Sequence, residues 1–335
     1  MCSILGLIDF DNKHPSKNEV IFDLNKLLSH RGPDDEGYFN DEYISFAFNR
    51  LSIIDLNLGN QPIIRNNIIS IFNGEIYNFK SIRQELEKLN YKFETNSDSE
   101  IIPNAFNEWG VDFVKKLSGM FSIAIYDKKN RKTYLFRDRI GIKPLYYSNI
   151  DAGLIFSSEV KGIINFPGFK KKIDYTALYS YLSFRYPTNN NNYFFKNIKR
   201  LNPGHYLEID LNLKKITEHQ YWKLSINKPK YKKSEKFYLE KLDQLLNDSV
   251  KSHLQSDVPV GVFLSGGLDS SLIAAIATKY HAGRLKTYSV GFKETKYNEG
   301  NKANLISKHI NSEHTEIIIE KLREDNRKLR LIHSN

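Results

Sequence analysis

The chain begins Met1-Cys2-Ser3-Ile4-Leu5-Gly6-Leu7-Ile8-Asp9-Phe10. Residues 4–10 form a short apolar run that is bounded by Asp11 and Asn12, which predicts a buried strand with Cys2 at one end. We expect removal of Met1, because the side chain that follows is small. Cys2 would then carry a thiol and a free α-amino group that both titrate near neutrality, so the nucleophile would have its own base. By position alone, Cys2 could also be a cysteine without a chemical role.

Outward from this strand, the first two thirds of the chain mix strands with two or three helices. Apolar residues recur at helical spacing in residues 20–28 and 82–89, and residues 121–126 and 133–136 resemble a hairpin. Further strands are predicted at residues 68–72, 144–148 and 154–157. This mixture predicts sheets covered by helices and not a series of βαβ units.

The pattern changes after Leu224. Residues 225–236 are polar and lack periodicity, so we interpret them as a linker between a domain of residues 2–224 and a domain of residues 237–335. The elements expected beyond the linker are an amphipathic stretch at 237–254, an apolar strand at 258–264, a turn at 265–269, a helix at 270–280 and a strand at 287–292. This order predicts the start of an α/β nucleotide-binding domain with a parallel sheet.

Composition restricts the class of protein. A chain of 335 residues with 40% hydrophobic residues can form two cores, and a single cysteine excludes an internal disulfide framework, which suits a reducing cytosol. The first ten residues contain no Lys or Arg, unlike a secretory signal, and no apolar run approaches the roughly 18 residues that span a bilayer. We therefore expect a soluble, cytoplasmic protein without a membrane partner.

The net charge of +10 raises the question of nucleic acid. The basic residues are scattered, however, with short clusters only at residues 170–172 and 230–236, and Asn is abundant around them. Compositional bias explains such a surface more simply, so we expect no nucleic-acid partner.

The second region contains the loop Ser265-Gly266-Gly267-Leu268-Asp269-Ser270-Ser271. Two glycines let the backbone approach an anion, and the start of the following helix directs free N–H groups toward it. The serine hydroxyls add donors, and Asp269 could hold a Mg²⁺ that bridges phosphates. An ordinary strand-to-helix turn is the alternative. A P-loop of the form G-x-x-x-x-G-K-[ST] is absent from the sequence, which disfavours transfer of a γ-phosphate.

Polar segments interrupt the apolar runs of the first region. They are His30-Arg31-Gly32-Pro33-Asp34, Asn49-Arg50-Leu51-Ser52-Ile53-Ile54-Asp55, Asn73-Gly74-Glu75-Ile76-Tyr77-Asn78 and Ser97-Asp98-Ser99-Glu100. Each has a structural explanation on its own, since Asn73-Gly74 favours a hairpin turn and Ser97 or Asp98 favours a helix cap.

Together these segments supply what a thiol needs to attack an amide. Asn73 could donate its side-chain amide, and Gly74 its backbone N–H, to a tetrahedral oxyanion. Arg50 could bind a substrate carboxylate in a bidentate fork, and Asp98 and Glu75 could receive an α-ammonium. An amino acid with a side-chain amide fits such a pocket, and glutamine is the obvious candidate.

These motifs, together with Asp257-Val258-Pro259-Val260-Gly261-Val262-Phe263-Leu264 before the loop, resemble those of glutamine-hydrolysing asparagine synthetase, from residue 1 to about residue 320. The resemblance implies an α+β N-terminal-nucleophile glutaminase with an αββα sandwich, a class II glutamine amidotransferase domain, fused to a partial ATP-pyrophosphatase domain. In that family, ammonia from glutamine travels through a tunnel and displaces AMP from β-aspartyl-AMP, which forms from aspartate and ATP. The products are asparagine, glutamate, AMP and pyrophosphate.

The resemblance also assigns residues. It makes Cys2 the nucleophile, with Asn73 and Gly74 as the oxyanion hole. The glutamine-binding residues it implies are Arg50, Leu51, Ser52, Ile53, Ile54, Asn73, Gly74, Glu75 and Asp98. Those implied for ATP are Leu264, Ser265, Gly266, Gly267, Asp269, Ser270, Ser271 and Val290, with Asp269 as a Mg²⁺ ligand. Arg137-Asp138 and Ser158-Glu159-Val160-Lys161 match segments that in the family lie toward the contact between the two halves.

The chain also departs from the family. Ser3 stands where many members have Gly, and the family continues well beyond Asn335, including a second loop for ATP and the acceptor. A fragment, a frameshifted product and a natural short form are all open. Three functional alternatives follow: a related amidotransferase for another carboxylate, in a surface-polysaccharide or natural-product pathway; a chain with glutaminase activity only; and a regulatory binder of glutamine or ATP. A homodimer is also open.

Overall fold

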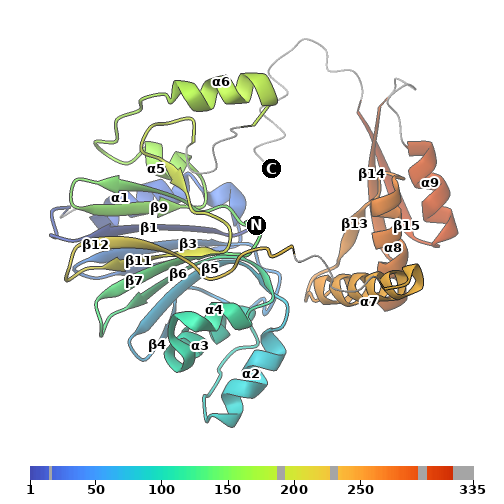
Figure 1. Ribbon diagram of the computed structural model, residues 1–335, viewed down its shortest axis with the longest axis horizontal. Coiled ribbons are helices and arrows are strands. Elements are labelled where there is room, and N and C mark those ends of the chain that lie inside the picture. Colours follow the sequence, from blue (N-terminus) through green and yellow to red (C-terminus); the bar gives the residue numbers. More distant parts are fainter. Residues whose placement is uncertain (15–16, 187–192, 227–232, 293–299, 320–335) are drawn as a thin grey trace. The chain divides into compact units, whose positions relative to one another are not determined.

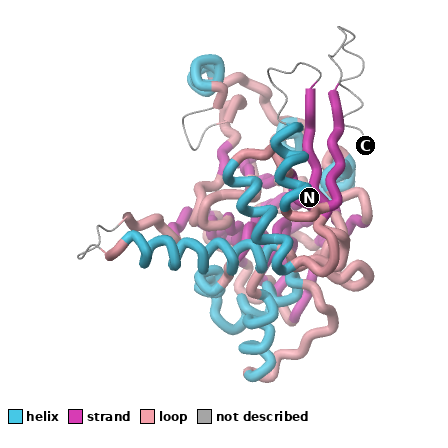
Figure 2. Tube along the Cα trace, turned by 90° about the vertical axis from the view of Figure 1, so that its right-hand side faces the viewer, coloured by secondary structure: helices cyan, strands magenta, loops and turns pink. Residues whose placement is uncertain are grey.

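The computed structural model describes residues 1–14, 17–186, 193–226, 233–292 and 300–319. The chain divides into two compact units, the first spanning Met1–Ser225 and the second beginning at Ile226. Figure 1 shows the elements of each unit, and Figure 2 shows the same trace from the side.

The first unit contains two antiparallel six-stranded sheets (Figure 1). The strands of one sheet, in spatial order, are β10 (Lys199–Arg200), β8 (Tyr146–Ile150), β9 (Gly153–Ser157), β1 (Ser3–Asp9), β3 (Ile44–Arg50) and β2 (Asp35–Asn40). Those of the other are β12 (Lys215–Gln220), β11 (His205–Asp210), β7 (Lys132–Arg137), β6 (Gly119–Asp127), β5 (Ile68–Ile76) and β4 (Ile63–Arg65). The two sheets stack face to face.

Helices cover the outer faces of both sheets. On the β1 sheet lie α1 (Lys17–Lys26) and α5 (Lys161–Ile164), and on the β5 sheet lie α2 (Phe79–Lys88), α3 (Ile101–Trp109) and α4 (Phe113–Lys116). The helix α6 (Tyr175–Phe184) follows α5, and short 3₁₀ turns occur at η1 (Ser29–Arg31), η2 (Asp98–Glu100) and η3 (Gly110–Asp112). The layers are helix, sheet, sheet, helix, which confirms the predicted αββα sandwich.

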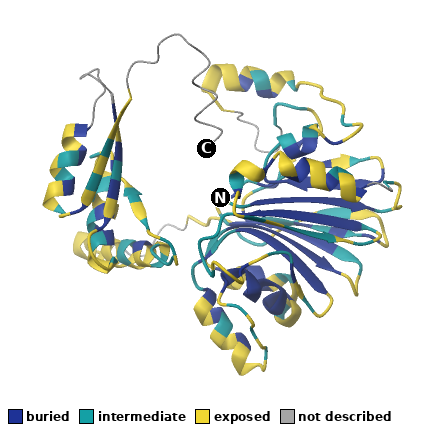
Figure 3. Ribbon diagram, turned by 180° about the vertical axis from the view of Figure 1, so that it is seen from behind, coloured by how far each residue is buried: buried dark blue, intermediate teal, exposed yellow. Residues whose placement is uncertain are grey.

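The strand β1 explains why the opening of the sequence is apolar at almost every position. Ile4 and Ile8 pack between the two sheets, whereas Leu5 and Leu7 pack under α1, so both faces of the strand are buried. A strand between two layers has no solvated face, so its sequence does not alternate with polar residues. Figure 3 shows the buried strands between partly exposed helices.

One local prediction is wrong. Asn73 and Gly74 do not form a hairpin turn, because β5 continues through Ile76 and pairs with β6, with Asn73 opposite Ser122 and Gly74 opposite Phe121. Glycine is needed here for close approach and not for a turn: a Cβ on Gly74 would lie 2.0 Å from the Met120 carbonyl oxygen. The predicted cap at Ser97 is confirmed, since its side chain accepts a hydrogen bond from the Ser99 N–H.

The second unit contains a three-stranded parallel sheet in the order β13 (Gly261–Phe263), β14 (Lys286–Phe292) and β15 (Glu313–Ile319). Its described helices are α7 (Glu235–His253), α8 (Leu268–Tyr280) and α9 (Gly300–His309). The predicted parallel sheet is confirmed, but β13 is shorter than the expected strand at 258–264. Pro259 has no N–H for a ladder, which is consistent with pairing that starts only at Gly261.

Part of the predicted linker at 225–236 lies outside the described residues, and α7 begins at Glu235. The polar C-terminal stretch also lies outside them. None of the helices in the described part of the chain is long and apolar enough to cross a membrane.

Candidate active site

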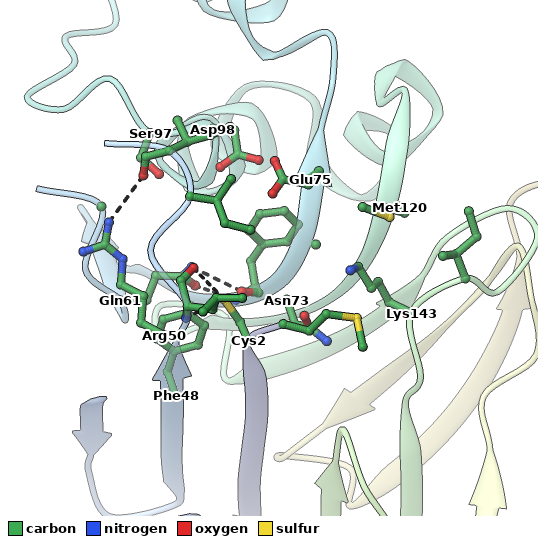
Figure 4. A pocket seen from close by; sticks show the side chains of 18 residues that line it. Cys2, Phe48, Arg50, Gln61, Asn73, Glu75, Ser97, Asp98, Met120 and Lys143 are labelled. Atoms are coloured by element: carbon green, nitrogen blue, oxygen red, sulfur yellow. Dashed lines mark hydrogen bonds between the residues drawn. The ribbon is translucent and has the colours of Figure 1, made fainter. Parts of the chain in front are cut away.

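A cavity of about 300 Å³ lies at one end of the sandwich, where β1 begins and where β3 and β5 end (Figure 4). Its lining comes from segments far apart in the sequence: Met1, Cys2, Phe48, Arg50, Leu51, Ile53, Ile54, Gly59, Gln61, Phe72, Asn73, Gly74, Glu75, Ser97, Asp98, Met120, Ile142 and Lys143. The structure therefore brings together every predicted residue of the first unit's site except Ser52. The Ser52 N–H donates to the Asp34 carboxylate at 2.7 Å, so this residue fixes the loop beside the cavity.

The thiol of Cys2 faces this cavity from the start of β1. The Leu51 N–H donates to the Cys2 Sγ at 3.4 Å, and the Arg31 Nε donates to the Cys2 carbonyl oxygen at 3.1 Å. Burial raises the pKa of the thiol, and the hydrogen bond from Leu51 opposes that rise. The environment thus orients the sulfur and disfavours its thiolate form.

Asn73 presents an unused donor to the same cavity. Its side chain is 1% exposed, and its Nδ2 has no hydrogen-bond partner among the described residues. A buried amide without a partner costs about 1–3 kcal/mol, and such groups are rare in folded proteins. Its amide is therefore available to an acceptor that enters the cavity.

Two carboxylates lie side by side at the end of β5. Burial and the neighbouring charge of Asp98 raise the pKa of Glu75 to about 8. Burial also raises the pKa of Asp98 to about 6, against the lowering effect of the Ile76 N–H, which donates to its Oδ2 at 2.9 Å. A ligand ammonium would stabilise the ionised forms of this pair, in which Asp98 is buried and Glu75 half-buried.

The guanidinium of Arg50 is more engaged than the sequence suggests. Its Nη1 donates to Asn60 Oδ1 at 2.6 Å, and its Nη2 donates to the carbonyl oxygens of Asp55 and Ile54 at 2.5 and 3.3 Å. These bonds fold residues 51–60 into the loop that places Leu51, Ile53 and Ile54 on the cavity wall. Arg50 thus shapes the wall, and a role as a carboxylate clamp stays a prediction.

Side-chain bonds also connect the polar segments to one another. The Asn96 N–H donates to the Asp55 carboxylate at 2.7 Å, which connects the loop after β3 to the turn that carries Asp98. Arg31 pairs with Glu159 at 3.1 Å, and the Ile4 N–H donates to Ser158 Oγ at 2.9 Å. The Ser158 to Lys161 segment thus supports β1 within the first unit, and any role between the two halves stays a prediction.

Sequence reasoning missed Gln61, Met120 and Lys143. The Gln61 amide pairs with both backbone groups of Phe72, at 2.6 and 3.2 Å, and Lys143 has a side chain only 5% exposed. The available signal was a single lysine inside the otherwise apolar segment Ile142-Lys143-Pro144-Leu145. A charge within such a segment is unusual enough to indicate a function.

In the second unit, the predicted phosphate loop joins β13 to α8. Gly266 has φ +75°, and α8 begins after Gly267 without a side-chain cap, so its first N–H groups have no capping partner. The Ser265 and Ser270 hydroxyls lie 3.0 Å apart, and the Ser271 Oγ is buried without a partner among the described residues. These donors at a helix start suit an anion.

The other residues predicted for ATP lie on the strands beside this loop. The Leu264 N–H donates to the Tyr288 carbonyl oxygen at 2.7 Å, and Val290, two residues further along β14, is 46% exposed. Asp269 is exposed in the first turn of α8.

A metal site made by the protein alone is not found in the described part of the chain, where no group of three His, Cys, Asp or Glu residues could hold an ion. Mg²⁺ is often bound by one or two carboxylates together with substrate phosphates. The exposed carboxylate of Asp269 could bind Mg²⁺ in this way, together with phosphates. The metal role of Asp269 stays a prediction.

Comparison with known proteins agrees with this architecture. Residues 1–222 match the glutamine amidotransferase domain family, and residues 241–323 match the asparagine synthase family. The chain is 39% identical over 306 residues to asparagine synthetase [glutamine-hydrolyzing] 1 of Bacillus subtilis, covering 89% of this chain and 47% of that protein. It is 38% identical over 340 residues to a putative asparagine synthetase [glutamine-hydrolyzing] 2 of Methanocaldococcus jannaschii, covering 94% and 64%.

Among solved structures, a glutamine phosphoribosylpyrophosphate amidotransferase from B. subtilis complexed with ADP and GMP covers 99% of this chain and 70% of its own, with 13% identity and a TM-score of 0.49. The chain spans about half the length of the B. subtilis relative and 64% of the length of the M. jannaschii one. By these matches, the chain belongs to the glutamine amidotransferase domain family through residues 1–222, and its residues 241–323 are similar to the asparagine synthase family, which confirms the resemblance in its sequence.

Proposed function

We propose that this chain hydrolyses glutamine on Cys2 and supplies the ammonia to an aspartate that ATP has activated, as part of glutamine-dependent asparagine synthesis. The observation that carries the proposal is a single cavity that holds the Cys2 thiol, the unpaired amide of Asn73 and the carboxylates of Glu75 and Asp98. These groups match the side-chain amide and the α-ammonium of glutamine.

The glutaminase reaction follows from these groups. After removal of Met1, the α-amine of Cys2 takes the thiol proton and the thiolate adds to the amide carbon of glutamine. Asn73 Nδ2 and the Gly74 N–H stabilise the tetrahedral oxyanion, which collapses to a thioester when the α-ammonium of Cys2 gives its proton to the departing nitrogen and ammonia leaves. Water then cleaves the thioester, giving glutamate and the free thiol. The balance is glutamine plus water to glutamate plus ammonia.

The second unit would bind the nucleotide. Ser265, Gly266 and the start of α8 would hold the phosphates of ATP, and Mg²⁺ would neutralise their charge when bound beside Asp269. Aspartate plus ATP gives β-aspartyl-AMP plus pyrophosphate, and ammonia then displaces AMP to give asparagine. Glutamine, aspartate and ATP are the partners of this proposal. A cytoplasmic location and a homodimer stay predictions.

The first test measures glutamate release from glutamine. The purified chain, with loss of Met1 verified by intact mass, should release glutamate, and Cys2→Ala should not, with an unchanged unfolding temperature as the control. Hydrolysis that survives in Cys2→Ala would show that another group is the nucleophile.

A second test addresses the acceptor. Asparagine should form from glutamine, aspartate and ATP with the product of the complete gene. If glutamate appears but asparagine does not, a different carboxylate acceptor or a chain with glutaminase activity only would replace aspartate in the proposal. If glutamine binds without any turnover, the chain is a binder and not an enzyme.

A further inference from the structure

Lys143 introduces a buried positive charge into the Cys2 cavity that the proposed reaction does not use. Its side chain is 5% exposed and lines the cavity with Cys2 and Glu75 (Figure 4). Among the residues that the structure describes, its ammonium makes no hydrogen bond and no ion pair within 4.0 Å. Buried ammonium groups are costly unless something compensates them, so this charge requires an explanation.

The backbone around Lys143 is held from both sides by buried charged residues. The Asp138 Oδ2 accepts the Lys143 N–H at 2.9 Å, and the Arg137 Nε donates to the Lys143 carbonyl oxygen at 2.8 Å. Arg137 also donates to the carbonyl oxygens of Gly141 and Leu201, each at 2.7 Å. Arg137 and Asp138 are 4% and 1% exposed. The side chain therefore leaves from an immobilised backbone, as expected for a preorganised functional group.

The other charged groups around the sulfur have defined tasks. The charged or titratable groups that act on this pocket are the chain's α-amino group, Arg31, Asp34, Arg50, Glu75, Asp98, Asp138 and Lys143. The guanidinium of Arg31 bonds to the Cys2 carbonyl and to Glu159, and that of Arg50 bonds to the loop at 54–60. Two cationic side chains line the described cavity wall, Arg50 and Lys143. Arg50 has hydrogen-bond partners, whereas the ammonium of Lys143 has none among the described residues.

We propose that Lys143 is a further functional residue of the glutamine site, where its ammonium stabilises the negative charge that develops on the Cys2 sulfur before attack. This inference rests on the proposed function, in which Cys2 reacts as a thiolate. No bond is made or broken by Lys143. It lowers the free energy of the thiolate and α-ammonium pair relative to the thiol and free amine, and the attacking sulfur then passes its charge to the oxyanion.

Electrostatics supports this geometry. Burial raises the pKa of the Cys2 thiol, and the positive charge of Lys143 acts in the opposite direction on Cys2 and on Glu75. Burial lowers the pKa of Lys143 itself, while Glu75 and Cys2 raise it. The three groups thus favour one another's charged forms in a site with little water, where charge interactions are less screened.

The test measures the reactivity of the thiol and not hydrolysis. Because Cys2 is the only cysteine, its rate of alkylation by iodoacetamide reports the thiolate fraction without interference. The full chain, processed to begin at Cys2, is titrated from pH 6 to pH 10 without glutamine. Four proteins are compared: the wild type, Lys143→Met, Lys143→Arg and, as a matched control, Lys128→Met in the exposed hairpin turn.

The expected result is a rise of about one pH unit in the alkylation midpoint of Lys143→Met, which makes alkylation about tenfold slower at pH 7. Lys143→Arg should retain most of the wild-type midpoint, and Lys128→Met should not move it. An unchanged midpoint in Lys143→Met would overturn the proposal. An equal rise in Lys143→Arg would also overturn it, because a role in packing would then explain both variants.

Folding and the proposed function are checked separately. Lys143→Met removes a buried charge and keeps the side-chain length, so we expect it to fold, and Lys143→Gln serves as a second neutral variant. Only variants that unfold at or above the wild-type temperature are compared. A shifted midpoint together with no glutamate release by the wild type would support the role of Lys143 and refute glutamine as the substrate.

Discussion

At the scale of the residue, Asn73 shows how a stability cost is retained next to a nucleophile. Its buried Nδ2 is unpaired among the described residues, and Asn73→Ala would remove that cost. We therefore expect Asn73→Ala to be as stable as the wild type or slightly more stable. The kcat of glutamate release should fall about 100- to 1000-fold, because one oxyanion donor is lost.

Steady-state kinetics and thermal unfolding on the same samples test this expectation. A rise in KM with an unchanged kcat would contradict it, since that pattern indicates uniform substrate binding and not stabilisation of the transition state.

Glu75 makes a prediction about pH. Its pKa of about 8 in the folded protein exceeds its ordinary value of 4.5, so the folded state binds the proton more tightly than the unfolded state. The stabilising contribution is complete below pH 4.5 and is lost as pH rises through 8. Glu75→Gln has no carboxyl to ionise and does not lose this contribution. The free energy of unfolding of Glu75→Gln minus that of the wild type should therefore increase by about 1–3 kcal/mol between pH 5 and pH 8.

Urea unfolding at several pH values measures this difference, and a constant difference between the two proteins would refute the assignment. The ionisation of Glu75 should also change the binding of glutamine. Because an α-ammonium binds the ionised carboxylate, the affinity of the wild-type pocket for glutamine should increase as pH rises toward 8.

At the scale of the element, the contact between β5 and β6 depends on Gly74. A Cβ at this position would lie 2.0 Å from the Met120 carbonyl oxygen and 2.8 Å from the Phe121 Cα, both of them backbone atoms. Gly74→Ala should therefore separate the strands next to the oxyanion hole. We expect a loss of about 1–3 kcal/mol in the free energy of unfolding and a large loss of glutamate release.

Gly168→Ala is a useful control for this variant. No atom lies within 4 Å of a Cβ built on Gly168, so only its φ of +82° opposes the substitution. It should cost about 1–2 kcal/mol and preserve activity. Equal activity of the two variants would show that close strand approach is not needed at Gly74.

The turn before α3 gives a second prediction at this scale. The buried Glu100 accepts from Arg65 at 2.5 Å and from the N–H groups of Glu94 and Thr95 at 2.9 and 2.8 Å. Glu100→Ala leaves the N–H groups of Glu94 and Thr95 without this acceptor, whereas Arg65 keeps its ion pair with Glu94, so the substitution should cost about 1–3 kcal/mol. Because the same turn carries Asp98, KM for glutamine should rise more than kcat falls. A stable variant with a normal KM would contradict this.

At the scale of the whole molecule, the proposed function assigns glutamine hydrolysis to the first unit and nucleotide binding to the second. Gly266 has φ +75°, and a Cβ there would lie 2.5 Å from the Lys302 Cβ, so Gly266→Ala should distort the phosphate loop. We expect at least tenfold weaker ATP binding, measured by calorimetric titration of the full chain. Glutamate release without ATP should remain within twofold of the wild type, because residues of the first unit perform it. Parallel losses of both would contradict this separation.

Much of this protein could be predicted from particular residues. The buried strand after Cys2, the hairpin around Asn130 and the loop at Ser265 are encoded locally, by apolar runs, turn residues and glycines. The true end of β5 is not encoded locally. Asn73-Gly74 has the composition of a turn, and only pairing with β6 extends the strand through these residues. The polar segments of the first unit suggested one pocket, but their order along the chain does not specify which atoms meet.

The sequence by itself determined the fold class and predicted a nucleophile, an amide-binding segment and a phosphate-binding segment, because these depend on residue types and spacing of short range. Only the tertiary structure decided that Arg50 folds a loop, that the Asn73 amide has no partner among the described residues and that Lys143 enters the Cys2 cavity. The physical reason is that burial, hydrogen-bond partners and electrostatic fields are set by segments distant in the chain. Cys2 and Lys143 are 141 positions apart and become neighbours only when the two sheets stack.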